Sequence, residues 1–156
     1  MQTTASWTIE PRHWEDPQGI ALRTRQRAEL DERYGCDDHE PGPVPSAEDI
    51  TVFLMAFDPD GTAIACGAFR ELDAASVEVK RMYVDPGSRG SGVAAALLAS
   101  LEKAAREGGW TTVKLETGEA QPDAIRFYER EGYHRIPRFG HYADSEISLC
   151  FAKPLA

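Results

Sequence analysis

The residues with the clearest chemical potential form a short turn, Arg89–Ala94, with the sequence Arg-Gly-Ser-Gly-Val-Ala. Its two glycines permit a tight backbone path and let a ligand approach main-chain N–H groups closely. The apolar run that follows predicts a helix, whose first turn offers unpaired N–H donors and the positive end of the helix dipole. Such a turn suits a phosphate group, and the guanidinium of Arg89 adds further donors. The alternative is an ordinary strand-to-helix connection.

Two segments, in this order, resemble motifs of the GNAT N-acetyltransferase superfamily. The turn fits the pattern Arg/Gln-x-x-Gly-x-Gly/Ala through Arg89, Gly92 and Ala94. Downstream, the sequence of residues 124–133 looks like the family's Ala-x-x-x-Tyr-x-x-x-Gly-Phe/Tyr segment. The resemblance covers the chain well from Thr51 onward and the first fifty residues only loosely. It implies an enzyme that moves an acetyl group from its co-substrate, acetyl-coenzyme A, to a primary amine.

The same resemblance implies a set of coenzyme contacts. The strand that carries Met82 and Val84 is expected to part from its parallel neighbour, so that the amides of the pantetheine arm bond to unpaired backbone groups. Gln121 stands where the family often has an asparagine that faces the coenzyme. The expected contacts are Met82, Tyr83, Val84, Arg89, Gly90, Ser91, Gly92, Val93, Ala94, Gln121 and Tyr128. Without the resemblance, Met82 and Val84 are equally well interpreted as strand core.

Acyl transfer from a thioester to an amine needs a neutral amine, a stabilised carbonyl oxygen and a proton for the departing thiolate. The resemblance implies that Tyr128 supplies that proton, because the matching tyrosine of the family points at the coenzyme sulfur. The alternative is a core tyrosine that packs beside Phe127 with its hydroxyl bonded to the backbone.

Glu78 is the predicted general base, acting directly or through a water. Family members with a carboxylate base often place it at the matching strand position, although some members need no dedicated base. Burial would raise the pKa of this carboxyl towards neutrality, where a base is effective. The alternative is a cross-strand ion pair with a neighbouring lysine or arginine.

Weaker signals indicate the acceptor side. Tyr34 directly follows a predicted helix, and His141 and Tyr142 lie in an aromatic-rich turn before the last predicted strand. We expect these three residues to line the acceptor pocket, with a packed hairpin loop as the alternative for the turn. The acid-rich segment 37–40 would suit a cationic acceptor. A small-molecule amine is therefore the predicted partner, with protein N-termini and lysine side chains still open.

These residues require a scaffold of strands and helices, which the sequence pattern supplies. Apolar runs at 51–57, 62–70 and 76–84 predict three adjacent antiparallel strands. Leucines and alanines recur at helical spacing over 93–107, and a right-handed crossover then makes the strand at 110–117 parallel to 76–84. The other predicted elements are strands at 7–10, 133–136 and 146–153 and helices at 16–33 and 122–131.

The expected fold class is α/β (α+β): a single GNAT-like domain with a mixed, mostly antiparallel sheet and helices on both faces. The domain spans residues 1–156, with residues 1–50 on the acceptor side and 51–156 forming the acetyl-CoA-binding core. A non-catalytic acyl-CoA-sensing or partner-binding module on the same scaffold is the main alternative, since fold does not fix function. A P-loop protein is disfavoured, because no Gly-Lys-Ser/Thr follows the turn.

Composition excludes several other classes. The chain has 156 residues, of which 42% are hydrophobic and 28% charged, as in a globular domain that buries a core. Its net charge of −9 argues against a nucleic-acid partner. It has no apolar stretch of membrane-spanning length, no signal-peptide pattern and no metal-ligand spacing among its cysteines. We therefore predict a cytoplasmic protein without metal or membrane partner, and the resemblance leaves a homodimer open.

Overall fold

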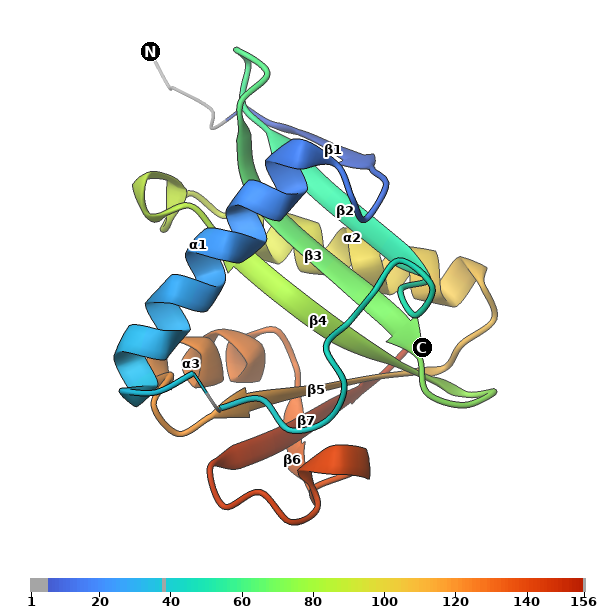
Figure 1. Cartoon of the computed structure of the whole chain (residues 1–156). Coiled ribbons are helices and arrows are strands. Elements are labelled where there is room, and N and C mark those ends of the chain that lie inside the picture. The colour runs from blue at the N-terminus through green and yellow to red at the C-terminus, as the bar shows by residue number, and fades with distance from the viewer. Residues whose placement is uncertain (1–5, 38, 156) are drawn as a thin grey trace.

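The computed structural model describes residues 6–37 and 39–155, and its framework is a seven-stranded sheet (Figure 1). The strands lie side by side in the order β1-β2-β3-β4-β5-β7-β6. Every neighbouring pair is antiparallel except β4 and β5, which are parallel. In chain order the elements are β1 (Thr8–Pro11), α1 (Pro17–Tyr34), β2 (Val52–Phe57), β3 (Ala63–Glu71), β4 (Ser76–Val84), η1 (Pro86–Ser88), α2 (Val93–Glu107), β5 (Thr112–Gly118), α3 (Pro122–Arg130), β6 (His134–Ile136), η2 (Gly140–Tyr142) and β7 (Ser148–Pro154).

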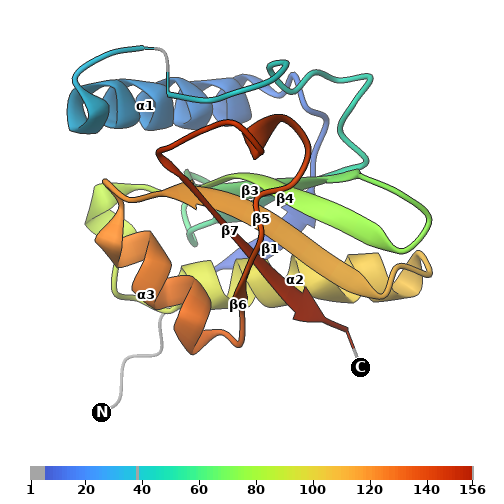
Figure 2. The same cartoon turned by 90° about the horizontal axis from the view of Figure 1, so that it is seen from below.

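Helices cover both faces of the sheet, as the sequence predicts. Figure 2 shows α1 on one face, together with residues 39–51 and the η2 loop, and α2 and α3 on the other. The larger core cluster lies under α2 and includes Leu97 and Leu101, while a smaller cluster on the α1 face includes Leu22 and Phe53. The central strands are buried on both faces, which explains why β2 is apolar throughout and does not alternate.

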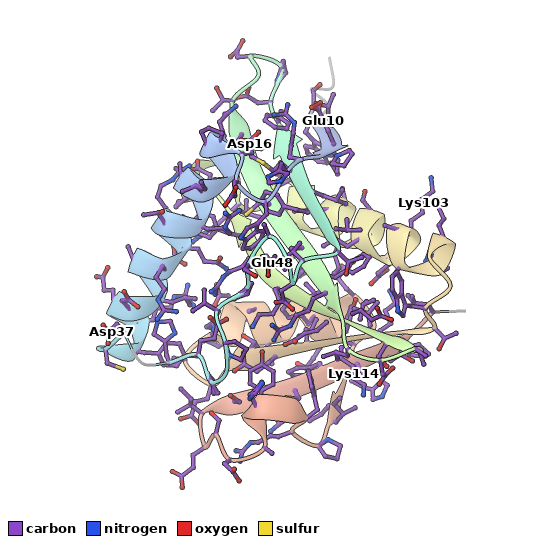
Figure 3. All side chains as sticks on the ribbon, turned by 45° about the vertical axis from the view of Figure 1, so that its right-hand side comes forward. Glu10, Asp16, Asp37, Glu48, Lys103 and Lys114 are labelled. Carbon is purple, nitrogen blue, oxygen red and sulfur yellow. The ribbon has the colours of Figure 1, made fainter. Side chains whose placement is uncertain are left out.

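Each helix terminus has a local cause. Asp16 caps α1 by accepting hydrogen bonds from the N–H groups of Gln18 and Gly19, and Pro17 provides a φ suited to the first turn. Gly35 ends this helix in the left-handed conformation that glycine adopts without strain. Charged side chains cover the outer surface, as Figure 3 shows for Lys103, which projects from α2. None of the helices in the described residues is both long and apolar enough to cross a bilayer.

The feature that positions the site is a fork between β4 and β5. The two strands pair only from Ser76 opposite Thr112 to Val79 opposite Leu115. Beyond these positions β4 continues to pair with β3 as far as Val84, and β5 continues to pair with β7, but they no longer pair with each other. The parting of these strands was predicted, and it leaves one edge of β4 without a strand partner among the described residues.

A bulge in β4 lies inside the fork. The register between β3 and β4 shifts between Cys66 and Ala68, so that Arg81 and Met82 of β4 have no simple partner. Arg81 has φ +59°, the one positive φ among the described residues other than glycine. Bulges bend a strand and increase its twist, and this one accompanies the divergence of β4 from β5.

Candidate active site

A cavity of about 540 Å³ lies at the open end of the fork. Its walls come from α1, the end of β4, the turn before α2, the start of α2, and α3. Every residue predicted to contact the coenzyme lines it, with the exception of Ser91. The Ser91 hydroxyl instead donates to the carbonyl of Ser88 and so stabilises the turn itself. The structure thus brings residues from separate segments to one site, while their binding of the coenzyme stays a prediction.

The turn has the geometry of an anion site. Gly90 and Gly92 have φ values of +83° and +93°, which side chains rarely tolerate. Gly92 precedes α2 without any side-chain cap, and in the described part of the chain the N–H groups of Ala94 and Ala95 make no hydrogen bond. Unpaired donors at a helix N-terminus attract anionic oxygens, because the helix dipole adds to their partial charge.

Arg89 stands beside this turn and already has an acidic partner. Its Nε donates to the carbonyl of Val84 at 3.0 Å, and its Nη2 donates to Glu29 of α1 at 2.8 Å. Both partners of the ion pair are about a third exposed, so the pair is held weakly. A phosphate that reached the turn would therefore compete with Glu29 for this guanidinium.

Tyr128 packs inside the cavity wall with a free hydroxyl. Its ring contacts Phe127 and Tyr133, and only 8% of the residue is exposed. Among residues 6–37 and 39–155, no group hydrogen-bonds to its hydroxyl, so the alternative of a hydroxyl bonded to the backbone is not found. Burial, and to a lesser degree the charge of Glu116, raise the pKa of Tyr128. The phenol therefore remains protonated at neutral pH and can act as a donor.

Glu78 occupies a closed environment. It is 1% exposed, and its carboxylate accepts hydrogen bonds from Arg70 Nε at 2.9 Å and from the Tyr142 hydroxyl. Arg70 lies directly opposite on β3, so this is the cross-strand ion pair that the sequence analysis gave as the alternative. Each carboxylate oxygen already has a partner, and the role of Glu78 as a base stays a prediction.

Glu78 belongs to a polar network that ties three segments together on the α1 face. Lys80 donates to Glu40 and to the Tyr142 hydroxyl, each at 2.9 Å, and Arg81 binds Glu40 through two nitrogens. Burial alone would raise the pKa of Glu40, but the two cations outweigh it and the net shift is downward. The network fixes the segment around Glu40 and the η2 turn against β4.

The residues predicted for the acceptor side have different environments. Tyr34 stacks on His39, and its hydroxyl accepts a hydrogen bond from Gln121 at 3.2 Å. His141 is exposed and borders a second cavity of about 280 Å³. Tyr142 is only 2% exposed, and its hydroxyl faces the network. A contact between Tyr142 and the acceptor stays a prediction, and its burial agrees better with the packed-loop alternative.

Sequence reasoning missed two contributions to the site. One face of α1, with Gln26, Glu29, Leu30 and Arg33, lines the cavity at the fork, although α1 was expected only on the acceptor side. The helical spacing of these positions was visible in the sequence, but nothing indicated which strands the face would meet. The second omission is Glu116, a partly buried carboxylate on β5 where the strands part. Its signal was a charged residue in the middle of a predicted strand, directly after Leu115.

Comparison with known proteins defines the class of this chain. Residues 9–133 match the model of the acetyltransferase (GNAT) family. An IAA acetyltransferase from Azospirillum brasilense is 38% identical over 104 residues, which cover 66% of this chain and 67% of that protein. The chain belongs to the GNAT family, and it is an acetyl-CoA-dependent acyltransferase.

Solved structures agree with this assignment. A Klebsiella pneumoniae protein assigned as an acyl-CoA N-acyltransferase superimposes with a TM-score of 0.84 at 32% identity, covering 98% of this chain and all of that one (100%). A GNAT family acetyltransferase from Elizabethkingia anophelis, solved with acetyl-CoA bound, has a TM-score of 0.71 at 16% identity over 96% of this chain and 98% of its own. The second likeness concerns the fold alone.

Proposed function

We propose that this protein acetylates a small-molecule primary amine, with the coenzyme lying along the fork between β4 and β5. The observation that carries the proposal is the unpaired edge of β4 beyond Val79, which opens into a cavity with the uncapped start of α2 at its mouth. Backbone N–H groups from Gly92 to Ala95 would hold the diphosphate. The edge of β4, including Met82 and Val84, would pair with the amides of the pantetheine arm.

Unsatisfied groups in the cavity fit such a ligand. Gln26 donates to the carbonyl of Met82 at 2.8 Å, and its own oxygen is buried without a partner among the described residues. A buried polar atom left unpaired is costly, and an amide N–H of the coenzyme would satisfy it. The cavity volume of about 540 Å³ also lies within the range of ligand sites.

The chemistry we propose is direct attack by the amine on the thioester, without a covalent enzyme intermediate. Tyr128 lies in the cavity wall with a free, protonated hydroxyl, so it can donate to the thiolate as the carbon–sulfur bond breaks. Such a donor contributes on the order of 10²–10⁴ in turnover, the range of general acid–base catalysis.

The acceptor side favours a small molecule over a polypeptide. The second cavity has only about 280 Å³ and is bordered by His39, Glu40 and His141. Its walls, the segment near Glu40 and the η2 turn, are fixed to β4 by the network around Lys80 and Tyr142. Walls held in place in this way favour a small acceptor over a peptide chain.

Thiol release from acetyl-CoA, measured across a panel of small amines, peptides with free N-termini and lysine peptides, tests the proposal. Tyr128→Phe should lower kcat by about 10²-fold or more and weaken acetyl-CoA binding far less. Tyr133→Phe is the matched control, because its hydroxyl binds Glu102 outside the cavity. Coenzyme binding without acceptor-dependent thiol release would support the non-catalytic module, and acetylation of peptides alone would contradict a small acceptor.

A further inference from the structure

We propose that Glu116 is the catalytic residue that takes the proton from the acceptor amine, and that Ser148 positions its carboxylate. The inference rests on the proposed acetylation of an amine and assigns the group that makes the amine nucleophilic.

The position of Glu116 in the sheet is the first argument. Leu115 is the last residue of β5 that pairs with β4, so Glu116 is the first residue inside the fork. Val113 and Leu115 belong to the core under α2, and strand alternation therefore directs Glu116 to the opposite face, which α1 covers. That face carries the network of Lys80, Glu40 and Glu78, whose charges act on the Glu116 carboxylate.

Electrostatic coupling supports this placement. After burial, the charge of Glu116 is the second cause that raises the pKa of Tyr128, the proposed donor to the thiolate. Burial raises the pKa of Tyr34 most, the hydrogen bond from Gln121 lowers it, and the charge of Glu116 adds to the upward shift. A coulombic interaction weakens with distance, so both shifts agree with a Glu116 carboxylate in the neighbourhood of Tyr128 and Tyr34.

The hydrogen bonding of Glu116 leaves one oxygen available. Its Oε2 accepts from the Ser148 hydroxyl at 2.7 Å, and Ser148 in turn lies 2.8 Å from the Ser145 hydroxyl. Within residues 6–37 and 39–155, no hydrogen bond or ion pair engages Oε1. Glu78 differs from Glu116 in two ways. Both of its carboxylate oxygens accept hydrogen bonds, and its side chain is almost completely buried.

The environment of Glu116 also makes its carboxylate a competent base near neutral pH. Burial raises its pKa to about 7, even though the hydrogen bond from Ser148 and the charge of Lys80 act in the opposite direction. Titratable groups face it from every element packed around it: Glu78 and Lys80 of β4, Glu40, Tyr34 of α1, Tyr128 of α3, Tyr142 of η2 and Cys150 of β7. A general base works best when its pKa is close to the working pH.

Every proton transferred in the proposed reaction is accounted for. An ammonium acceptor gives one proton to Oε1 of Glu116, and the neutral nitrogen then forms its bond to the thioester carbon. Tyr128 donates its proton to sulfur as the carbon–sulfur bond breaks, and its phenolate takes the second proton from nitrogen. Glu116, which is partly exposed, releases its proton to water before the next turnover.

The test is the pH dependence of kcat/KM for the amine, measured with two acceptors of different basicity. Each titrating group gives the pH profile of kcat/KM a sloping limb. A limb caused by Glu116 stays near pH 7 with both acceptors, whereas a limb caused by the amine moves with the pKa of that amine. In Glu116→Gln the fixed limb should disappear and kcat/KM should fall by about 10²-fold or more, with the Kd for acetyl-CoA unchanged. Glu119→Gln, which removes an exposed carboxylate three positions further along the chain, is the matched control and should keep the limb.

Ser148→Ala provides an independent variant. Because the Ser148 hydroxyl lowers the pKa of Glu116, its loss should move the fixed limb to higher pH while turnover on the alkaline plateau is retained. A merely structural role of Ser148 would change turnover at every pH and leave the limb in place. An active wild-type enzyme whose limb survives in Glu116→Gln would overturn the inference and leave the proposed function intact. A wild-type protein that acetylates no amine would refute the proposed function itself.

Discussion

Gly118, at the end of β5, leaves room for the Tyr34 side chain because it carries no Cβ. A Cβ placed on Gly118 would lie 1.5 Å from the Tyr34 hydroxyl oxygen and 2.8 Å from the ring carbon that carries it. Gly118→Ala must therefore displace the hydroxyl and break its hydrogen bond with Gln121. Overpacking of this kind costs about 1–3 kcal/mol in the free energy of unfolding.

The backbone at Gly118 is compatible with alanine, because its φ is not positive. Once the clash is removed, a glycine-to-alanine change should stabilise the protein by about 0.4–1 kcal/mol, since it restricts the unfolded chain. The prediction is therefore a change of sign: Gly118→Ala destabilises the wild type, and it stabilises a Tyr34→Ala background. The two effects are measured by urea unfolding of all four proteins in a double-mutant cycle.

Equal effects of Gly118→Ala in both backgrounds would refute the close approach of Tyr34 to β5, and with it the placement of Tyr34 beside the fork. Tyr34→Phe offers a milder check. It removes the hydroxyl oxygen that lies nearest to the new Cβ, so it should relieve part of the cost of Gly118→Ala.

Three further predictions concern the turn and the buried charges. Gly92→Ala should weaken acetyl-CoA binding severalfold by calorimetry, because φ +93° is strained for alanine, whereas Gly61→Ala at φ +82° should cost similar stability and leave binding unchanged. Arg70→Met should lower the free energy of unfolding by about 3–5 kcal/mol, because it leaves Glu78 buried without its arginine, and a loss below 1 kcal/mol would count against that ion pair. Glu116→Gln should raise stability at pH 8 by about 1–3 kcal/mol, because the folded-state pKa is raised to about 7 from 4.5. This gain should shrink as the pH falls through 7 and vanish below 4.5, and a gain that is independent of pH would contradict a raised pKa.

Much of the fold was predictable because its signals are local. The apolar spacing of residues 93–107 determines α2, and the glycines at its start permit the turn whatever the rest of the chain does. The parallel pairing of β4 and β5 follows from the handedness of a strand–helix–strand connection. Part of the cavity at the fork could be anticipated for the same reason, since the turn before α2 and the wall from α3 lie within the family's two motifs.

The rest depends on contacts between distant segments. Glu78 meets Arg70 through the register of β3 and β4, and Tyr142 joins them from 64 positions further along the chain. No periodicity indicates such pairings, so a residue that looked like a base in the sequence is found in an ion pair. Glu116 presents the opposite case, because its chemical character depends on burial at the fork and on a hydroxyl from β7.

A crystal structure of the complex with acetyl-CoA tests most directly whether the fork between β4 and β5 is the coenzyme site. We predict the diphosphate within hydrogen-bond distance of the N–H groups that begin α2, and pantetheine amides bonded to β4 beyond Val79, with the sulfur beside the Tyr128 hydroxyl. A coenzyme bound to another surface, with β4 and β5 paired along their full length, would contradict the account.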